Sequence, residues 1–114
     1  MVRDARPVAT EILTRIEKLK RLRSAGPLDV SIGSDTRDIV ERCIEVISEA
    51  SRRLPEGLKA QHPEVPWRNV ADIGNVLRHH YDGVIEPVLT DVVLYQIDVL
   101  ERAVQRILLD LNRE

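Results

Sequence analysis

The sequence predicts an all-α fold, an up-and-down antiparallel bundle of four main helices. Apolar residues recur along most of the chain at intervals of three and four, which places them on one face of a helix. No stretch of useful length alternates apolar with polar residues, as a half-buried strand would. The core must be aliphatic, because 43% of the residues are hydrophobic, only 3% are aromatic and none is Phe.

Length and charge narrow the class of protein. We expect a single helical domain over residues 1–114, the size of one ordinary domain. The net charge of -2 argues against a broad basic surface for nucleic acid and leaves a localised RNA site open. Cys43 is the only cysteine, which predicts a reducing compartment and a packing role. No apolar run is long enough to span a bilayer and none resembles a signal peptide, so we expect a cytoplasmic protein without a membrane partner.

The first helix is expected over residues 7–23, and the segment SAGP, residues 24–27, is expected to stop it. Its apolar face consists of Val8, Ile12, Ile16, Leu19 and Leu22. Its opposite face is basic and consists of Arg15, Lys18, Lys20, Arg21 and Arg23. Such a face is either a nucleic-acid patch or an ordinary solvated helix surface.

The second helix is expected to begin at Ser34 or Asp35, either of which can cap the free amides of its first turn. Its apolar stripe is predicted to consist of Ile39, Cys43, Val46, Ile47, Ala50 and Leu54. A break at Pro55 follows, and then a short helical turn over residues 58–62.

The third helix is expected to start at Pro66, where the missing amide hydrogen costs nothing, and to end at Asp82-Gly83. Trp67 is interpreted as an anchor that closes one end of the core, with its indole N–H near an acceptor. Pro87 is expected to open the fourth helix. That helix carries a heptad-like seam of Val93, Ile97, Leu100, Val104, Ile107 and Leu111. The seam serves either an intramolecular bundle or a second subunit.

The stretch GNVLRHHY, residues 74–81, gathers polar and titratable side chains at the end of the third helix. On a helix, Asn75 lies beside His79, and Arg78 lies beside Gly74 and Tyr81. A cationic helix end is also favoured by the helix dipole, without any chemistry. The glycine indicates close packing, because Gly inside a helix is unfavourable by ~1 kcal/mol relative to Ala. The histidine spacing and the isolated glycines predict neither a metal site nor a cofactor.

The run PWRNVADIGNVLRHHY, residues 66–81, resembles the signature of HepT-like proteins of the HEPN superfamily. Their motif is Arg, four to six residues, His, any residue and Tyr. A helix such as IVERCIEVISEASRRLP, the segment HPEVPW and a long amphipathic C-terminal helix extend the resemblance over nearly the whole chain. The resemblance implies a dimeric helical bundle that cleaves RNA without a metal at a site between its subunits. It also implies a partner nucleotidyltransferase that acts as antitoxin and modifies the motif Tyr.

Carried over residue by residue, the resemblance assigns His79 to the motif His, Tyr81 to the motif Tyr, and Asn75 to an Asn that often follows the Arg. The chain departs from the motif at the Arg itself, because that position is Gly74. Arg78, one helical turn along the same face, is the expected substitute, and Arg68 is too far from the histidine in sequence to fit the motif.

Two functions therefore remain open. In the first, the chain is the toxin of a toxin–antitoxin pair and an endoribonuclease. In the second, Gly74 marks an inactive site, and the chain is a dimeric binding partner whose Tyr81 is adenylylated by the nucleotidyltransferase.

Overall fold

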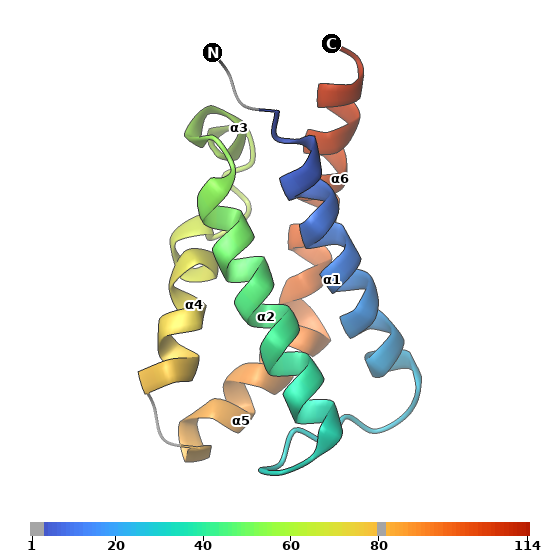
Figure 1. The fold of residues 1–114 in the computed structure, drawn as a ribbon, viewed down its shortest axis with the longest axis vertical. Helices are drawn as coiled ribbons and strands as arrows, with labels where there is room; N and C mark the ends of the chain where they lie inside the picture. The colour runs from blue at the N-terminus through green and yellow to red at the C-terminus, as the bar shows by residue number, and fades with distance from the viewer. Residues whose placement is uncertain (1–3, 80–81) are drawn as a thin grey trace.

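The computed structural model describes residues 4–79 and 82–114, and all regular structure in these ranges is helical (Figure 1). The α-helices are α1 (Arg6–Ser24), α2 (Asp35–Arg53), α3 (Glu56–Ala60), α4 (Trp67–His79), α5 (Asp82–Asp91) and α6 (Ile97–Asn112). A turn of π-helix, η1 (Val92–Gln96), connects α5 directly to α6. The prediction of an all-α fold is confirmed. Within the described ranges, no helix is both long and apolar enough to cross a membrane.

The long helices run alternately up and down the bundle (Figure 1). Helix α2 packs between α1 and α4, and α1 also packs against α6. Two ion pairs fix the antiparallel course of α1 and α6. Lys20 pairs with Glu101, whereas Arg23, one turn later in α1, pairs with Asp98, earlier in α6. This order places the start of α1 and the end of α6 at one end of the bundle, and Figure 1 shows the end of α4 near the start of α5 at the other.

Helix α2 has a wide buried face, because it packs against helices on two sides. Cys43 and Ile47 of the predicted stripe are buried, as expected. The prediction for Ile39 is wrong, because this side chain is 41% exposed. Val40 and Ile44 are buried instead, since the second neighbouring helix extends the buried arc in their direction.

The start of α2 follows a capping residue in the sequence. The Ser34 hydroxyl accepts a hydrogen bond from the amide of Arg37 at 2.9 Å, which confirms the predicted cap of α2. The short helix α3 lies two residues earlier than expected. Pro66 stands just before α4 rather than inside it, and its carbonyl accepts from the amide of Val70 at 3.0 Å. The indole N–H of Trp67 donates to the carbonyl of His62 at 3.0 Å, which confirms the partner expected for this anchor.

The C-terminal third departs from the prediction at Pro87. This residue does not open a helix, and Asp82-Gly83 does not end one: α4 ends at His79, and α5 begins at Asp82 with Pro87 in its interior. Proline has no amide hydrogen for the carbonyl four residues earlier, so α5 lacks one internal hydrogen bond there.

The seam along η1 and α6 is buried within the chain, and it packs against α1. Its most buried members are Val93, Ile97, Leu100, Val104 and Ile107. These members of the seam therefore pack within the bundle.

Candidate active site

Gly74 brings α4 close to α2 in the half of α4 that carries the candidate site. The Ser48 hydroxyl donates to the carbonyl of Ala71 at 2.8 Å, and the Gly74 amide donates to the same hydroxyl oxygen at 3.4 Å. A Cβ built on Gly74 would lie 3.3 Å from the Ser48 oxygen, which is tighter than most such contacts. The glycine is therefore a close-packing position, as its place inside a helix indicated.

The Arg78 side chain turns back along α4 toward this glycine, the direction that long helical side chains favour. Its Nη2 donates to Oδ1 of Asn75 at 2.6 Å, and its Nη1 lies 3.6 Å from the Cβ position of Gly74. Both Asn75 and Arg78 are exposed. The guanidinium therefore lies beside Gly74, the position that the resemblance assigns to the motif Arg.

The remaining predicted residues fall into three groups. His79 is the exposed last residue of α4, at the helix end where the dipole favours a cation. Tyr81, and with it His80, lies outside the described residues. Arg68 lies in the first turn of α4, about 15 Å along the helix axis from Arg78, and so does not share the surface beside Gly74.

Asn75, Arg78 and His79 thus gather at one exposed helix end. In the part of the chain that the structure describes, no carboxylate forms an ion pair with Arg78 or His79. A guanidinium held only by a neutral amide keeps donors for an incoming anion, and its planar fork matches a phosphate. This arrangement can bind a phosphodiester and place an imidazole next to it.

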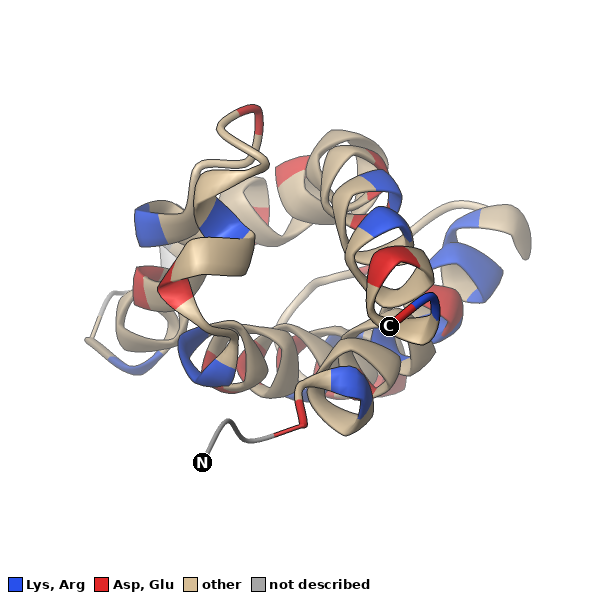
Figure 2. Ribbon diagram, turned by 90° about the horizontal axis from the view of Figure 1, so that it is seen from above, with Lys and Arg blue, Asp and Glu red and all other residues tan. Residues whose placement is uncertain are grey.

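The basic face of α1 is less available to an anion than its sequence suggested. The Lys20 ammonium lies 3.1 Å from the Glu101 carboxylate, and the Arg23 guanidinium lies 3.0 Å from that of Asp98. The hydrogen bond from Arg23 holds the pKa of Asp98 below its usual range, and the same bond raises the pKa of Arg23. Figure 2 shows Lys and Arg positions interspersed with Asp and Glu positions around the bundle. The solvated-surface interpretation therefore fits Lys20 and Arg23 better than a nucleic-acid patch does.

Ser48 is the residue of this region that the sequence interpretation missed. It lies on the buried face of α2, 26 residues before Gly74, and its hydroxyl is satisfied by α4. Arg52, one turn later, also donates to the Ala71 carbonyl, at 2.5 Å. The sequence did contain one indication of this contact, a pair of small polar residues, Ser48 and Ser51, on an otherwise apolar helix face.

Among the side chains that the structure describes, no group of three or more His, Cys, Asp or Glu could hold a metal ion.

The fold and the site define a small all-α bundle protein with a cationic cluster at the end of one helix. The chain belongs to the HepT-like ribonuclease family, since residues 12–107 match the family described as Ribonuclease HepT-like. A candidate RNase of Methanocaldococcus jannaschii is 33% identical over 69% of this chain. A candidate RNase of Caldanaerobacter subterraneus is 36% identical over 59% of the chain. A protein of Thermococcus cleftensis named as a probable ribonuclease HepT is 41% identical over 58% of it.

These alignments span 65%, 60% and 60% of the three relatives' own lengths. No solved structure matches the chain significantly. The relatives support the family to which the chain belongs.

Proposed function

We propose that this protein is a HepT-type endoribonuclease that cleaves RNA without a metal ion, using His79, Arg78, Tyr81 and Asn75. One imidazole removes the proton from a ribose 2′-hydroxyl, whose oxygen then attacks the adjacent phosphorus. The bond from phosphorus to the 5′ oxygen breaks, and that oxygen leaves with a proton from a second imidazole. Arg78 stabilises the negative charge that builds on the pentavalent phosphate, and the Tyr81 hydroxyl donates to a phosphate oxygen.

The observation that carries this proposal is the position of the Arg78 guanidinium. It lies beside Gly74, the position of the motif Arg, and Asn75 holds it there. An arginine one helical turn later thus puts its guanidinium on the surface from which the motif Arg would start. The absence of a side chain at Gly74 does not remove the cation from the site.

The mechanism needs an acid and a base, and this is the reason for proposing a homodimer with the site between its subunits. Each chain contributes one motif histidine, His79. His62 is no substitute, because it precedes α4, bonds to Glu64 at 3.3 Å and stands at the opposite end of that helix. A two-fold axis near the end of α4 would bring two copies of His79 to one cleft.

In the cell we propose that the chain is the toxin of a toxin–antitoxin pair in the cytoplasm. Its antitoxin would be a nucleotidyltransferase that modifies Tyr81. The proposal rests on the family to which the chain belongs and on the match of Tyr81 to the motif Tyr.

The test is cleavage of purified total RNA in EDTA by the wild type, His79→Ala and Arg78→Ala, with helicity checked by circular dichroism. The wild type should cleave, and both variants should lose cleavage by at least about 100-fold, the typical loss when one group that stabilises the transition state is removed. Cleavage that disappears in EDTA and returns with a divalent cation would contradict the metal-independent mechanism. Intact RNA with the wild type would contradict the ribonuclease proposal itself.

A second function is favoured by one observation, the lack of a side chain at Gly74. In this alternative the protein is a non-catalytic dimer and the substrate of the nucleotidyltransferase. The Tyr81 hydroxyl would attack the α-phosphorus of ATP, and pyrophosphate would leave. Mass spectrometry after incubation with a nucleotidyltransferase of this type and ATP tests it. Adenylylation of the wild type and of His79→Ala, but not of Tyr81→Phe, combined with no RNA cleavage, would support this alternative.

A further inference from the structure

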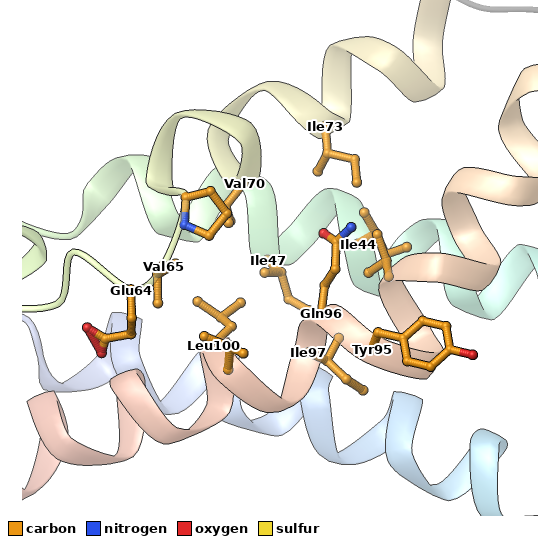
Figure 3. A pocket seen from close by; sticks show the side chains of 13 residues that line it. Ile44, Ile47, Glu64, Val65, Val70, Ile73, Tyr95, Gln96, Ile97 and Leu100 are labelled. Atoms are coloured by element: carbon orange, nitrogen blue, oxygen red, sulfur yellow. The ribbon is translucent and has the colours of Figure 1, made fainter.

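Helix α4 has two different sides, and a polyanion fits only one of them. One side forms a wall of an apolar groove, where Val70 and Ile73 are among the lining residues (Figure 3). Of the described residues that line this groove only Glu64 is charged, so a phosphate would find no cation there. The other side adjoins α2 and carries Asn75 and Arg78. An RNA strand at the candidate site is therefore expected to follow the surface where α2 and α4 meet.

A second guanidinium, that of Arg52, lies on this surface. Arg52 is in the last turn of α2, and its Nη2 donates to the carbonyl of Ala71 in α4 at 2.5 Å. Ala71, Asn75 and Arg78 follow one another at intervals of four and three residues, so they lie on one face of α4. The Arg52 guanidinium therefore stands at the start of a stripe that continues along α4 to Arg78.

The Ser48 hydroxyl lies between the two guanidinia. It donates to the Ala71 carbonyl at 2.8 Å, and this is the same oxygen to which Arg52 donates. It also lies 3.3 Å from the Cβ position of Gly74, and Nη1 of Arg78 lies 3.6 Å from that position. Ala71 and Gly74 are only about 4.5 Å apart along the helix axis. The two guanidinia are thus close enough to bind neighbouring phosphates of one strand.

Arg52 keeps donors for such a phosphate. A guanidinium has several N–H groups, and the bond to Ala71 uses one of them. Its Nη1 lies 3.8 Å from the Glu49 carboxylate, a contact between two exposed side chains that is longer than a hydrogen bond. Exposed ion pairs contribute little, so an RNA phosphate can take the place of Glu49. The next residue, Arg53, points toward α1 instead, where it pairs with Glu11 at 2.8 Å.

We infer that Arg52 is a second RNA-binding residue, and that it binds the phosphate next to the one held by Arg78. The inference rests on the proposed function for its ligand, single-stranded RNA. It adds a subsite from α2 to a site that is otherwise built from α4. Each contact between a guanidinium and a phosphate is a charge-assisted hydrogen bond that also releases a counterion, so the affinity falls as the salt concentration rises.

The test is the binding of a single-stranded RNA oligonucleotide that is 2′-O-methylated at every ribose, measured by fluorescence anisotropy at several salt concentrations. The protein cannot cleave this probe, because the 2′-hydroxyl that would attack is blocked. Arg52→Gln removes the charge but keeps an amide N–H for the Ala71 carbonyl. This variant should bind about tenfold more weakly at low salt. The slope of log affinity against log salt should also become shallower by about 0.7, the share of one phosphate contact on a single strand.

Arg53→Gln is the matched control, because it removes the same charge from the neighbouring position, which faces α1. This variant should keep the salt slope of the wild type. Equal slopes for Arg52→Gln and the wild type would overturn the inference, and so would a wild type that does not bind the probe.

If circular dichroism shows that Arg52→Gln does not fold, Glu49→Gln decides. It removes the carboxylate that competes with the phosphate at Arg52, so binding should tighten by about twofold. Glu11→Gln is the matched change at Arg53 and should have no such effect. Equal affinities of Glu49→Gln and Glu11→Gln would overturn the inference.

The inference and the proposed function fail in different ways. Binding with the predicted salt slopes, combined with unmodified RNA that stays intact, would contradict only the proposed cleavage. Cleavage of unmodified RNA, combined with a salt slope that Arg52→Gln leaves unchanged, would overturn the inference and leave the activity.

Discussion

The guanidinium of Arg78 lies 3.6 Å from the point at which a Cβ on Gly74 would stand. The resemblance to HepT-like proteins assigns an arginine to that position, and here a guanidinium lies close to it, carried on a residue one turn later. A hydrogen bond of 2.6 Å to Asn75 keeps it there.

The first prediction concerns a variant whose guanidinium is carried by position 74 instead of position 78. In the Arg78→Ala background, Gly74→Arg should recover part of the lost RNA cleavage, because the new side chain begins on the same face of α4. Gly74→Lys in the same background is the matched control and should recover less, since an ammonium does not offer the planar fork that binds a phosphate at two points. Cleavage rates of the two double variants give the comparison, and equal recovery by both would contradict the role of the fork.

A second prediction concerns the contact between Gly74 and Ser48. Ala is favoured over Gly inside a helix by ~1 kcal/mol, but in the wild type the added methyl group would meet the Ser48 oxygen at 3.3 Å. Gly74→Ala should therefore stabilise the Ser48→Ala variant by about 1 kcal/mol and the wild type by clearly less. The four free energies of unfolding, from denaturant titrations, form a double-mutant cycle. The same gain in both backgrounds would mean that Ser48 does not restrict this position.

A fall in pH should weaken the ion pair between Arg23 of α1 and Asp98 of α6. Arg23 holds the pKa of Asp98 below its usual range, so the ionised carboxylate stabilises the fold above pH ~4, and this contribution is lost as the pH falls through the lowered pKa. Both side chains are partly exposed, so Asp98→Asn should cost only about 0.5–1 kcal/mol at pH 7. The cost should shrink toward zero below the folded pKa. A cost that is the same at pH 7 and pH 2 would show that the ion pair is not its source.

The fourth prediction concerns the Trp67 anchor at the start of α4. Trp67→Phe keeps an aromatic ring but removes the hydrogen bond of 3.0 Å from the indole to the His62 carbonyl, which should destabilise the fold by about 1 kcal/mol. Circular dichroism must follow the unfolding, because the variant has no tryptophan for fluorescence. Unchanged stability would indicate that water replaces the indole at this carbonyl.

Much of the fold could be predicted from local patterns. Apolar spacing located the long helices, and Ser34 marked the start of α2 because a cap acts within one turn. Ile39 was misplaced because the buried arc of α2 depends on how many helices pack against it, which spacing along one helix does not reveal. The prediction for Pro87 was wrong for a related reason. Proline is favoured at helix starts, yet packing of the surrounding apolar residues holds it inside α5 despite a lost hydrogen bond.

The candidate site could be predicted only in part. The spacing of Gly74 and Arg78 on one helix face was readable, and the structure places the two together. The role of Ser48 could not be predicted from the sequence, because its contact with α4 joins residues that are far apart in the sequence. Neither the catalytic role of His79 nor the modification of Tyr81 follows from the fold, and both stay predictions.

The most direct test of the central proposal is the initial rate of RNA cleavage in EDTA for the wild type, Arg78→Ala and Arg68→Ala. Arg68 is the matched control, an exposed arginine on the same helix but about 15 Å from the site. We predict a loss of at least about 100-fold for Arg78→Ala and a rate near that of the wild type for Arg68→Ala. Equal rates for Arg78→Ala and the wild type would contradict the assignment of the missing motif arginine to Arg78.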